Sequence, residues 1–405
     1  MGERTDPGSG PGADPSADPG ANSSADELAD AGAQRAADLL HHRAASLLPG
    51  DPLAPPLVLA APYHLPGEAD APYRYGRMSN PTWEACESAL SLLEGAPCLL
   101  FPSGMAAITA ALMALLRSGD TVVLPSDGYY VTRRIVERFL VPLGIRVREH
   151  PTADFAQAPM RGAALVFCET PSNPGLEVCD LVAVAAAAHA AGAHLVVDNT
   201  TMTPLLQRPL ELGADMVVAA DTKAPGGHSD LLSGHVATDD AALFERLLEW
   251  RTLSGGIAAP FDAWLLHRGL ETLEVRLSRM GGNAQCLAER LRERGGDAAA
   301  RQPRLAVRYP GLDTDPSHAL CRRQMLGGGF LIGLTLPDAT LAERFLADCA
   351  LIAQSTSFGG VHTSGERRAR WGEDVSDGSI RLSIGCEPLE PLWNAIDASL
   401  SAVGC

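Results

Sequence analysis

Short apolar runs alternate with helical patterns of hydrophobic and polar positions between residues 81 and 222. The apolar runs predict buried strands at residues 121–124, 145–148, 164–167, 194–197 and 216–219. Helical spacing predicts helices at residues 83–93, 106–116, 130–140 and 181–191. Strands that are apolar along their whole length and alternate with helices are typical of a parallel sheet covered on both faces. The sequence therefore predicts an α/β fold with a mostly parallel sheet flanked by helices.

A second, smaller α/β unit is expected after a long helical stretch at residues 260–294. It contains a strand-like run at 328–336, a helical pattern near 341–350, and the segment SIRLSIG followed by a last helix. The expected divisions are a disordered acidic tail at 1–26, an N-terminal helix and extended arm at 27–75, a large domain at 76–265 and a small C-terminal domain at 266–405. The tail is expected to be disordered because its Gly, Pro, Ser, Ala and Asp residues offer almost nothing to bury.

Charge and cysteine content narrow the classes of protein. The 405 residues include 32 basic and 49 acidic side chains, and the formal net charge is −17. A surface of this charge repels phosphate backbones and anionic lipids, so we expect neither nucleic acid nor a membrane as partner. The nine cysteines form no CxxC pair, and no targeting pattern opens the sequence. These features predict a reduced cytoplasmic protein, and the cysteine and histidine spacings predict no metal site.

Only one of the 32 basic residues is a lysine, Lys223, and the others are arginines. A lysine can lose its proton near neutral pH and bond to an aldehyde, whereas an arginine can do neither. Lys223, Asp198 and Glu169 each follow shortly after a predicted strand. The carboxyl ends of parallel strands share one edge of a sheet, where ligands bind. The alternative is a surface lysine retained by chance.

An aldehyde cofactor such as pyridoxal phosphate would need groups that the sequence supplies at successive strand ends. Asp198 could keep the ring nitrogen protonated. The Ser-Gly-Met segment at 103–105 opens an apolar helix whose first N–H groups could bind the phosphate. Tyr129 or Tyr130 could cover the ring. Taken singly, Asp198 and the serine could equally be ordinary helix caps, but their order along the chain favours a cofactor site.

At these residues the sequence resembles the cystathionine/methionine metabolism family of pyridoxal phosphate enzymes, which are the transsulfuration enzymes of fold type I. The resemblance runs from about residue 50 to the end of the chain. It is carried by YGRMSNPT (75–82), FPSGMAAI (101–108), ETPSNPGLEVCD (169–180), HLVVDNTTMTPLLQRPLELGADMVV (194–218), DTKAPGGHSD (221–230), PFDAWLLHRGLETL (260–273) and SDGSIRLSIGCE (376–387). The lysine segment is the most specific of these. The resemblance implies the type I fold and pyridoxal 5'-phosphate as cofactor.

The resemblance also implies a role for each matching residue. Lys223 would bond the cofactor's aldehyde and move protons, and Tyr130 would stack on the ring and act as acid or base. Asp198 would pair with the ring nitrogen. The other cofactor contacts would come from Ser103, Gly104, Met105, Thr222 and Asn173, and from Tyr75 and Arg77 of a neighbouring subunit.

The substrate end of the site is implied in the same way. Arg381 would bind the α-carboxylate of the amino acid, with Asn173 beside it, and His362 and Thr363 would lie near its side chain. Glu169 would position other groups. Because Tyr75 and Arg77 would complete a neighbour's site, the resemblance implies a homo-oligomer, expected to be a tetramer, with active sites shared between subunits.

Several positions depart from the family pattern. Ala220 stands where the family usually has a serine, and Thr363 replaces another serine. His362 stands where members that handle cystathionine have a glutamate. Methionine γ-lyases carry a cysteine two residues after the stacking tyrosine, where Thr132 follows Tyr130 in this chain. The stretch after Thr363 is short and lacks the usual P-A-x-x-T-H segment, and its RRAR run is interpreted as surface or as a lid over an anionic substrate, with surface favoured.

The missing glutamate decides the predicted substrate. A glutamate at position 362 could bind the distal ammonium of cystathionine through its carboxylate, and the histidine found there is a poor substitute. The sequence therefore predicts a carbon–sulfur lyase that performs γ-elimination on L-methionine or a related thioether, giving 2-oxobutanoate, ammonia and a thiol. The alternatives are a γ-replacement synthase resembling cystathionine γ-synthase or O-acylhomoserine sulfhydrylase, a cystathionine γ- or β-lyase, and a cofactor-binding protein without turnover.

Overall fold

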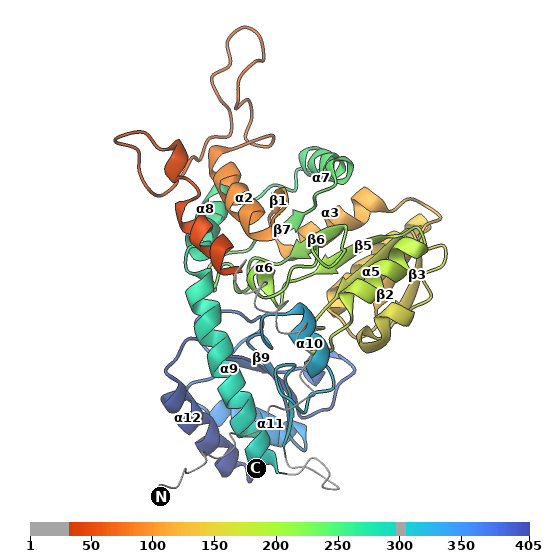
Figure 1. Ribbon diagram of the computed structural model, residues 1–405, viewed down its shortest axis with the longest axis vertical. Coiled ribbons are helices and arrows are strands. Elements are labelled where there is room, and N and C mark those ends of the chain that lie inside the picture. Colours follow the sequence, from red (N-terminus) through yellow and green to blue (C-terminus); the bar gives the residue numbers. More distant parts are fainter. Residues whose placement is uncertain (1–31, 297–304) are drawn as a thin grey trace, which may run out of the picture.

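The computed structural model describes residues 32–296 and 305–405, and its centre is a seven-stranded sheet (Figure 1). The strand order is β1-β7-β6-β5-β4-β2-β3. The strands are β1 (Cys98–Phe101), β2 (Thr121–Pro125), β3 (Arg146–His150), β4 (Leu165–Glu169), β5 (His194–Asp198), β6 (Met216–Ala219) and β7 (Gly234–Ala237). Strands β6, β5, β4, β2 and β3 pair in parallel, and β7 pairs antiparallel with both β6 and β1. The fold is the predicted α/β class with a mostly parallel sheet.

Helices cover both faces of this sheet because its strands are apolar on both faces. Helices α3 (Gly104–Leu115) and α7 (Ala241–Ser254) pack on one face, where Phe167 and Val196 point. Helix α5 (Leu181–Ala190) packs on the other face against Val166 and Val197. Helices α2 (Pro81–Glu94) and α8 (Pro260–Leu270) form a further buried cluster beside β1 and β7. Two short helices, α4 (Tyr130–Ile135) and α6 (Thr203–Leu206), begin after β2 and β5.

A second sheet of five strands packs with its own helices. Its order is β10-β11-β12-β9-β8. The strands are β8 (Ala306–Arg308), β9 (Leu331–Thr335), β10 (Ala353–Gln354), β11 (Ser364–Arg367) and β12 (Ser379–Ser383). The helices on this sheet are α9 (Leu273–Gly295), α11 (Ala339–Asp348) and α12 (Leu389–Ala402), whereas α10 (His318–Gln324) packs through Cys321 against Val178 and Met202. In Figure 1, α9 runs from the side of the larger sheet down along the smaller one. The core of the smaller unit lies between α9, α11, α12 and the strands of its sheet.

Most elements expected from the sequence are present. The predicted helical stretch at 260–294 is divided between α8 and α9, and the predicted helix at 130–140 passes from α4 into a π-helical segment at Val136–Leu140. Sequence reasoning missed β1 and β7. Strand β7 reads GHVA, and its apolar run is interrupted by His235, which is buried in a polar network.

The N-terminal part follows the expected order of helix and extended arm. A helix covers residues 32–41, and the chain between residues 47 and 80 then loops away from the sheets at the top of Figure 1. The expected acidic tail at 1–26 lies outside the described residues, and the division of the chain into four parts stays a prediction. Among the residues that the structure describes, no helix is both long and apolar enough to cross a membrane.

Candidate active site

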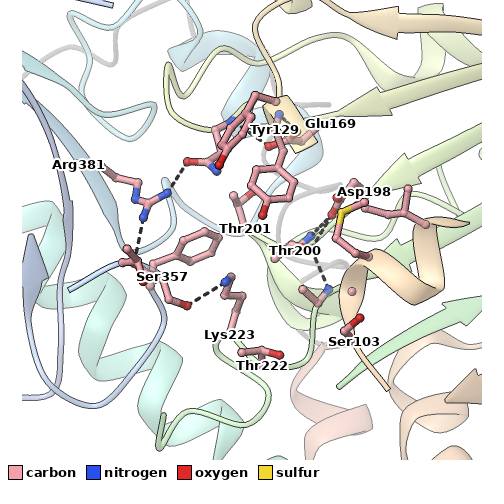
Figure 2. A pocket seen from close by; sticks show the side chains of 18 of the residues that line it. Ser103, Tyr129, Glu169, Asp198, Thr200, Thr201, Thr222, Lys223, Ser357 and Arg381 are labelled. Atoms are coloured by element: carbon pink, nitrogen blue, oxygen red, sulfur yellow. Dashed lines mark hydrogen bonds between the residues drawn. The ribbon is translucent and has the colours of Figure 1, made fainter. Parts of the chain in front are cut away.

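A cavity of about 320 Å³ lies at the carboxyl ends of the parallel strands, where the two sheets meet. Figure 2 shows side chains of the larger sheet on one side of it and Ser357 and Arg381 of the smaller unit on the other. The expected residues that line it are Ser103, Gly104, Met105, Tyr130, Asn173, Asp198, Thr222, Lys223 and Arg381. The structure therefore brings most of the expected cofactor contacts to one place.

Lys223 stands on a tight turn after β6. Its Nζ donates to Ser357 Oγ at 2.8 Å and lies 5.0 Å from the centre of the Phe358 ring. Burial, together with the positive charge of Arg381, lowers the pKa of Lys223 to about 8, although Asp198 opposes that change. A much larger fraction of this lysine is therefore neutral near physiological pH than of an ordinary lysine, and the neutral amine is the form that attacks an aldehyde.

The lysine turn is held from β7 and from α9. The Thr222 N–H donates to the Ser233 carbonyl at 3.2 Å, and the Ser233 N–H donates to Thr222 Oγ1 at 3.1 Å. Arg276 on α9 donates to the carbonyls of Ala224 and Pro225 at 2.5 and 3.2 Å. These bonds fix the turn without using the lysine amine, which stays directed into the cavity.

Asp198 ends β5 and faces the same cavity. Its Oδ1 accepts from the Thr200 hydroxyl at 2.5 Å and from the Thr200 N–H at 3.0 Å. Burial raises the pKa of Asp198, while the two Thr200 bonds and the charge of Lys223 oppose the increase. The Thr200 hydroxyl also accepts from the Ala220 N–H at 2.9 Å, so the carboxylate is fixed to the strand that leads to the lysine.

Glu169 ends β4 and connects two loops at the cavity. One of its oxygens accepts from the Tyr129 N–H at 2.6 Å and the other from the Asn173 N–H at 2.8 Å. Burial and the nearby charge of Asp198 raise the pKa of Glu169 well above its usual value. Glu169 thus holds both loops in place, and its expected role beside a bound cofactor stays a prediction.

The N-terminus of α3 opens onto the cavity. Ser103 caps this helix, because its hydroxyl accepts from the Ala106 N–H at 3.1 Å. The first N–H groups of a helix have no partner within it, so those of Gly104 and Met105 are suited to bind an anion. A Cβ on Gly104 would lie only 2.4 Å from the Ala220 Cβ. This close approach requires a glycine at 104 and explains why a small residue stands at 220.

Arg381 on β12 reaches the cavity from the smaller sheet. It donates to Asn173 Oδ1 at 2.6 Å, to the Ser357 carbonyl at 2.9 Å and to Glu366 Oε2 at 3.2 Å (Figure 2 draws the first two). Its guanidinium lies 4.9 Å from the centre of the Phe358 ring. Burial and the neighbouring charge of Arg368 lower the pKa of Arg381 to about 10, so it remains a cation at neutral pH.

Four expected residues lie away from this cavity. Thr363 is fully buried, and its hydroxyl donates to Glu387 Oε2 at 2.7 Å and accepts from the Gly385 N–H at 2.9 Å. His362 is exposed beside it. Tyr75 and Arg77 are exposed near the end of the N-terminal arm. The Arg77 guanidinium lies 5.6 Å from the centre of the Tyr75 ring and donates to the Thr252 carbonyl at 2.5 Å. Their contact with a neighbouring subunit stays a prediction.

The structure adds residues that sequence reasoning did not assign to the site. The unassigned polar and aromatic side chains at the cavity are Thr200, Thr201, Thr356, Ser357, Phe358, Glu366, Arg368 and Trp371. The RRAR run at 367–370 contains Arg368 and is flanked by Glu366 and Trp371, and the sequence interpretation favoured surface for this run. Glu366 lies on β11 and Arg368 lies just past its end, and both are buried.

The family follows from a match over residues 50–401 to the model described as Cys/Met metabolism PLP-dependent enzyme. The chain belongs to this family, whose cofactor is pyridoxal 5'-phosphate. Among its relatives, "Putative cystathionine gamma-lyase" of Streptomyces coelicolor is 48% identical and the match covers 84% of this chain and 87% of that one. The L-methionine gamma-lyase of Pseudomonas putida is 36% identical, with coverage of 87% and 94%.

Solved structures give the same family. A methionine gamma lyase from Micromonospora echinospora superposes with a TM-score of 0.83 at 36% identity, over 90% of this chain and 98% of that one. Cystathionine gamma synthase from Xanthomonas oryzae pv. oryzae superposes with a TM-score of 0.85 at 34% identity, over 91% and 98%. Lyases and synthases of the family thus share this fold, and the comparisons leave the reaction open between them.

The described residues fit the family's cofactor. The cavity combines an amine of lowered pKa at Lys223, a buried carboxylate at Asp198 and a helix N-terminus at Gly104 that a side chain would block. An aldehyde, a ring nitrogen and a phosphate are the three groups that these features are suited to bind. Thr222 also lines the cavity, and its contact with the phosphate stays a prediction.

Proposed function

We propose that this enzyme is a carbon–sulfur lyase that performs γ-elimination on L-methionine or a related thioether amino acid, releasing 2-oxobutanoate, ammonia and a thiol. The observation that carries the proposal is the charge inventory of the cavity. Its acidic lining residues are Asp198, Glu169 and Glu366. Asp198 accepts two hydrogen bonds from Thr200, and Glu169 accepts from the N–H groups of Tyr129 and Asn173. Glu366 is saturated by four donors, so none of these carboxylates is free to receive the distal ammonium of cystathionine.

Each carboxylate oxygen of Glu366 accepts hydrogen bonds from two donors. Oε2 accepts from Arg368 at 2.6 Å and from Arg381 at 3.2 Å, and Oε1 accepts from Arg370 at 2.9 Å and from the Trp371 N–H at 2.6 Å. Burial would raise the pKa of Glu366, but the bonds from Arg370 and Trp371 and the nearby guanidiniums lower it. An uncharged side chain on the substrate is therefore favoured.

The chain's own residues supply the steps of this reaction. Arg381 binds the α-carboxylate and so orients the Cα–H bond toward Lys223. The bound pyridoxal phosphate supplies an electron-withdrawing ring, kept protonated by Asp198. Lys223 Nζ would take the proton from Cα, give it up to the bound cofactor and, neutral again, take the proton from Cβ, while a neighbouring acid would donate a proton to the departing sulfur. Addition of water completes the release of the keto acid and ammonia.

Tyr129 and Tyr130 are both candidates for the side chain that covers the cofactor ring and acts as an acid. Both line the cavity, with ring centres 5.6 Å apart in an edge-on arrangement. The sequence favoured Tyr130, whereas the contacts favour Tyr129. The Tyr129 N–H is bound by Glu169, and burial raises its pKa, with the charges of Asp198 and Arg368 close enough to influence it. We therefore assign the role to Tyr129 and expect Tyr129→Phe to lower kcat by about a hundredfold, and Tyr130→Phe by less than tenfold.

The oligomer is part of the proposal. Tyr75 and Arg77 do not line the cavity of their own chain, and both are exposed. An exposed arginine and tyrosine in contact with each other are suited to bind a phosphate in another subunit. We propose a homotetramer with shared sites, which light scattering would detect. Arg77→Ala should then weaken cofactor retention, and mixing it with Lys223→Ala chains should restore part of the activity.

The reaction is tested by product analysis. L-Methionine is added to the purified, cofactor-loaded enzyme, with Lys223→Ala as control, and 2-oxobutanoate and methanethiol are measured. The proposal expects both products, and neither in the control. Products formed only from cystathionine would instead indicate a cystathionine lyase. Cystathionine formation from an O-acylhomoserine and cysteine, without release of thiol from methionine, would indicate a γ-replacement synthase.

A further inference from the structure

Trp371 lies at the opening of the cavity, on the short helix Ala369–Trp371 that follows β11. It lines the cavity and yet 47% of its surface is exposed, so the indole forms part of the wall and of the rim. Half-exposed tryptophans that line a pocket are suited to contact ligands, because one large apolar ring covers much surface.

Two contacts fix the indole. Its Nε1 donates to Glu366 Oε1 at 2.6 Å, and the Arg370 guanidinium lies 5.3 Å from the centre of the ring. Arg370 also donates to the same oxygen of Glu366, at 2.9 Å. The ring is thus held by a carboxylate that is 2% exposed and by a stacked cation, and its polar edge is already satisfied.

The same carboxylate connects Trp371 to the residue that would bind the substrate. Glu366 on β11 lies opposite Arg381 on β12 in the strand register, and its other oxygen accepts from Arg381. One carboxylate group therefore separates the indole from the guanidinium. A substrate held by its α-carboxylate at Arg381 would have its side chain within reach of the indole.

We propose that Trp371 is the specificity-determining residue of this enzyme, and that its indole limits the length of the substrate side chain. The polar neighbours of the ring are paired with one another, so the surface offered to a ligand is apolar. The preferred substrates are short, unbranched amino acids without a charge at the far end. The inference deepens the proposed function and depends on it for the placement of the α-carboxylate at Arg381.

The test uses amino acids that bind without a leaving group. L-Norleucine and L-2-aminooctanoic acid have unbranched apolar side chains that differ by two methylene groups. Their dissociation constants are measured from the change in absorption of the cofactor-loaded enzyme. The variants are Trp371→Ala, Trp371→Phe and, as a matched control, Trp393→Ala. Trp393 is also a partly exposed tryptophan beneath an arginine, with the Arg290 guanidinium 5.6 Å from the ring, and it lies outside the cavity on α12.

Trp371→Ala should improve binding of the longer amino acid relative to the shorter one by about tenfold, because two more methylene groups gain a place to be buried. Trp371→Phe and Trp393→Ala should keep the wild-type ratio within about threefold. An unchanged ratio in Trp371→Ala, or an equal loss for both ligands, would overturn the inference.

The failure of the inference is distinguishable from the failure of the proposed function. A wild-type enzyme that binds norleucine but releases no thiol from methionine would refute γ-elimination, while the ratio of the two dissociation constants would still test Trp371. A wild-type enzyme that releases thiol from methionine but binds neither amino acid would overturn the inference alone, because neither side chain would then reach the indole.

Discussion

Glu169 and Asp198 lie directly opposite each other in the register of β4 and β5, so two buried carboxylates stand side by side at the end of the sheet. Burial raises the pKa of both, and the increase is well above the usual value for Glu169. Two carboxylates this close repel each other, so each one makes ionisation of the other less favourable. At Asp198 the Thr200 bonds and the charge of Lys223 oppose this increase, and this makes Asp198, of the two, the group suited to pair with a protonated ring nitrogen.

Asp198→Asn should therefore impair the chemistry more than the fold. An amide cannot hold a proton on the ring nitrogen, and we expect kcat to fall by about a hundredfold or more. The measurement is steady-state release of keto acid, with cofactor content determined by absorption. Asp240→Asn, which replaces the cap of α7 by another good cap, is the control. Normal turnover by the Asp198 variant would contradict the assignment.

The lowered pKa of Lys223 predicts how fast the cofactor-free protein takes up pyridoxal phosphate. Only the neutral amine reacts with the aldehyde, so the rate should rise with pH and reach half its maximum near pH 8, where the lysine loses its proton. Stopped-flow absorption between pH 6.5 and 9.5 measures this. A small alkyl amine in the same buffers serves as reference, with its midpoint above pH 10. A protein midpoint near that of the reference would contradict the lowered pKa.

Replacement of Arg381 by lysine should weaken substrate binding although the charge is kept. The guanidinium binds a carboxylate through two parallel N–H groups, which an ammonium cannot reproduce, and it also holds Asn173 and Ser357. We expect KM for L-methionine to rise by roughly tenfold to a hundredfold. Arg344→Lys on α11 is a control outside the cavity. The two variants would have similar KM values if Arg381 had no contact with substrate.

His235 on β7 is expected to contribute to stability through charge. Burial alone would lower its pKa, but Asp221 at 2.8 Å and Glu94 at 3.1 Å raise it to about 10. This stabilisation is fully present below the unfolded pKa of about 6.5 and is lost as pH rises through about 10. Stability of the wild type should therefore decrease from pH 7 to 10.

His235→Gln should remove most of that pH dependence and, at pH 7, cost about 3 kcal/mol, because two buried carboxylates lose their cation. Thermal unfolding of the cofactor-loaded protein at several pH values measures both effects. His189→Gln is the control, since its imidazole is half exposed beside Asp215. Parallel pH curves for wild type and the His235 variant would show that His235 is neutral in the folded protein.

The sequence predicted the cofactor side of the cavity because that side follows from periodicity. Strands that read HLVV or MVVA are recognisable, the ends of parallel strands share one edge, and Asp198 and Lys223 come just after such ends. The substrate side has no comparable signal. Strand β11 reads SGER and has no apolar run, yet it places Glu366 opposite Arg381. Thr363 was expected at the substrate, but its hydroxyl is used by Glu387, a pairing over 24 residues that only the fold reveals.

The single lysine of the chain has a practical consequence. Every other cationic side chain in the sequence is an arginine or a histidine, so the folded protein offers amine-directed reagents one ε-amine, inside the cavity. Apart from the terminal amine, a mass increase after such labelling therefore reports directly on this position. Occupancy of the site becomes countable chain by chain in an intact-mass spectrum, without any assay of turnover.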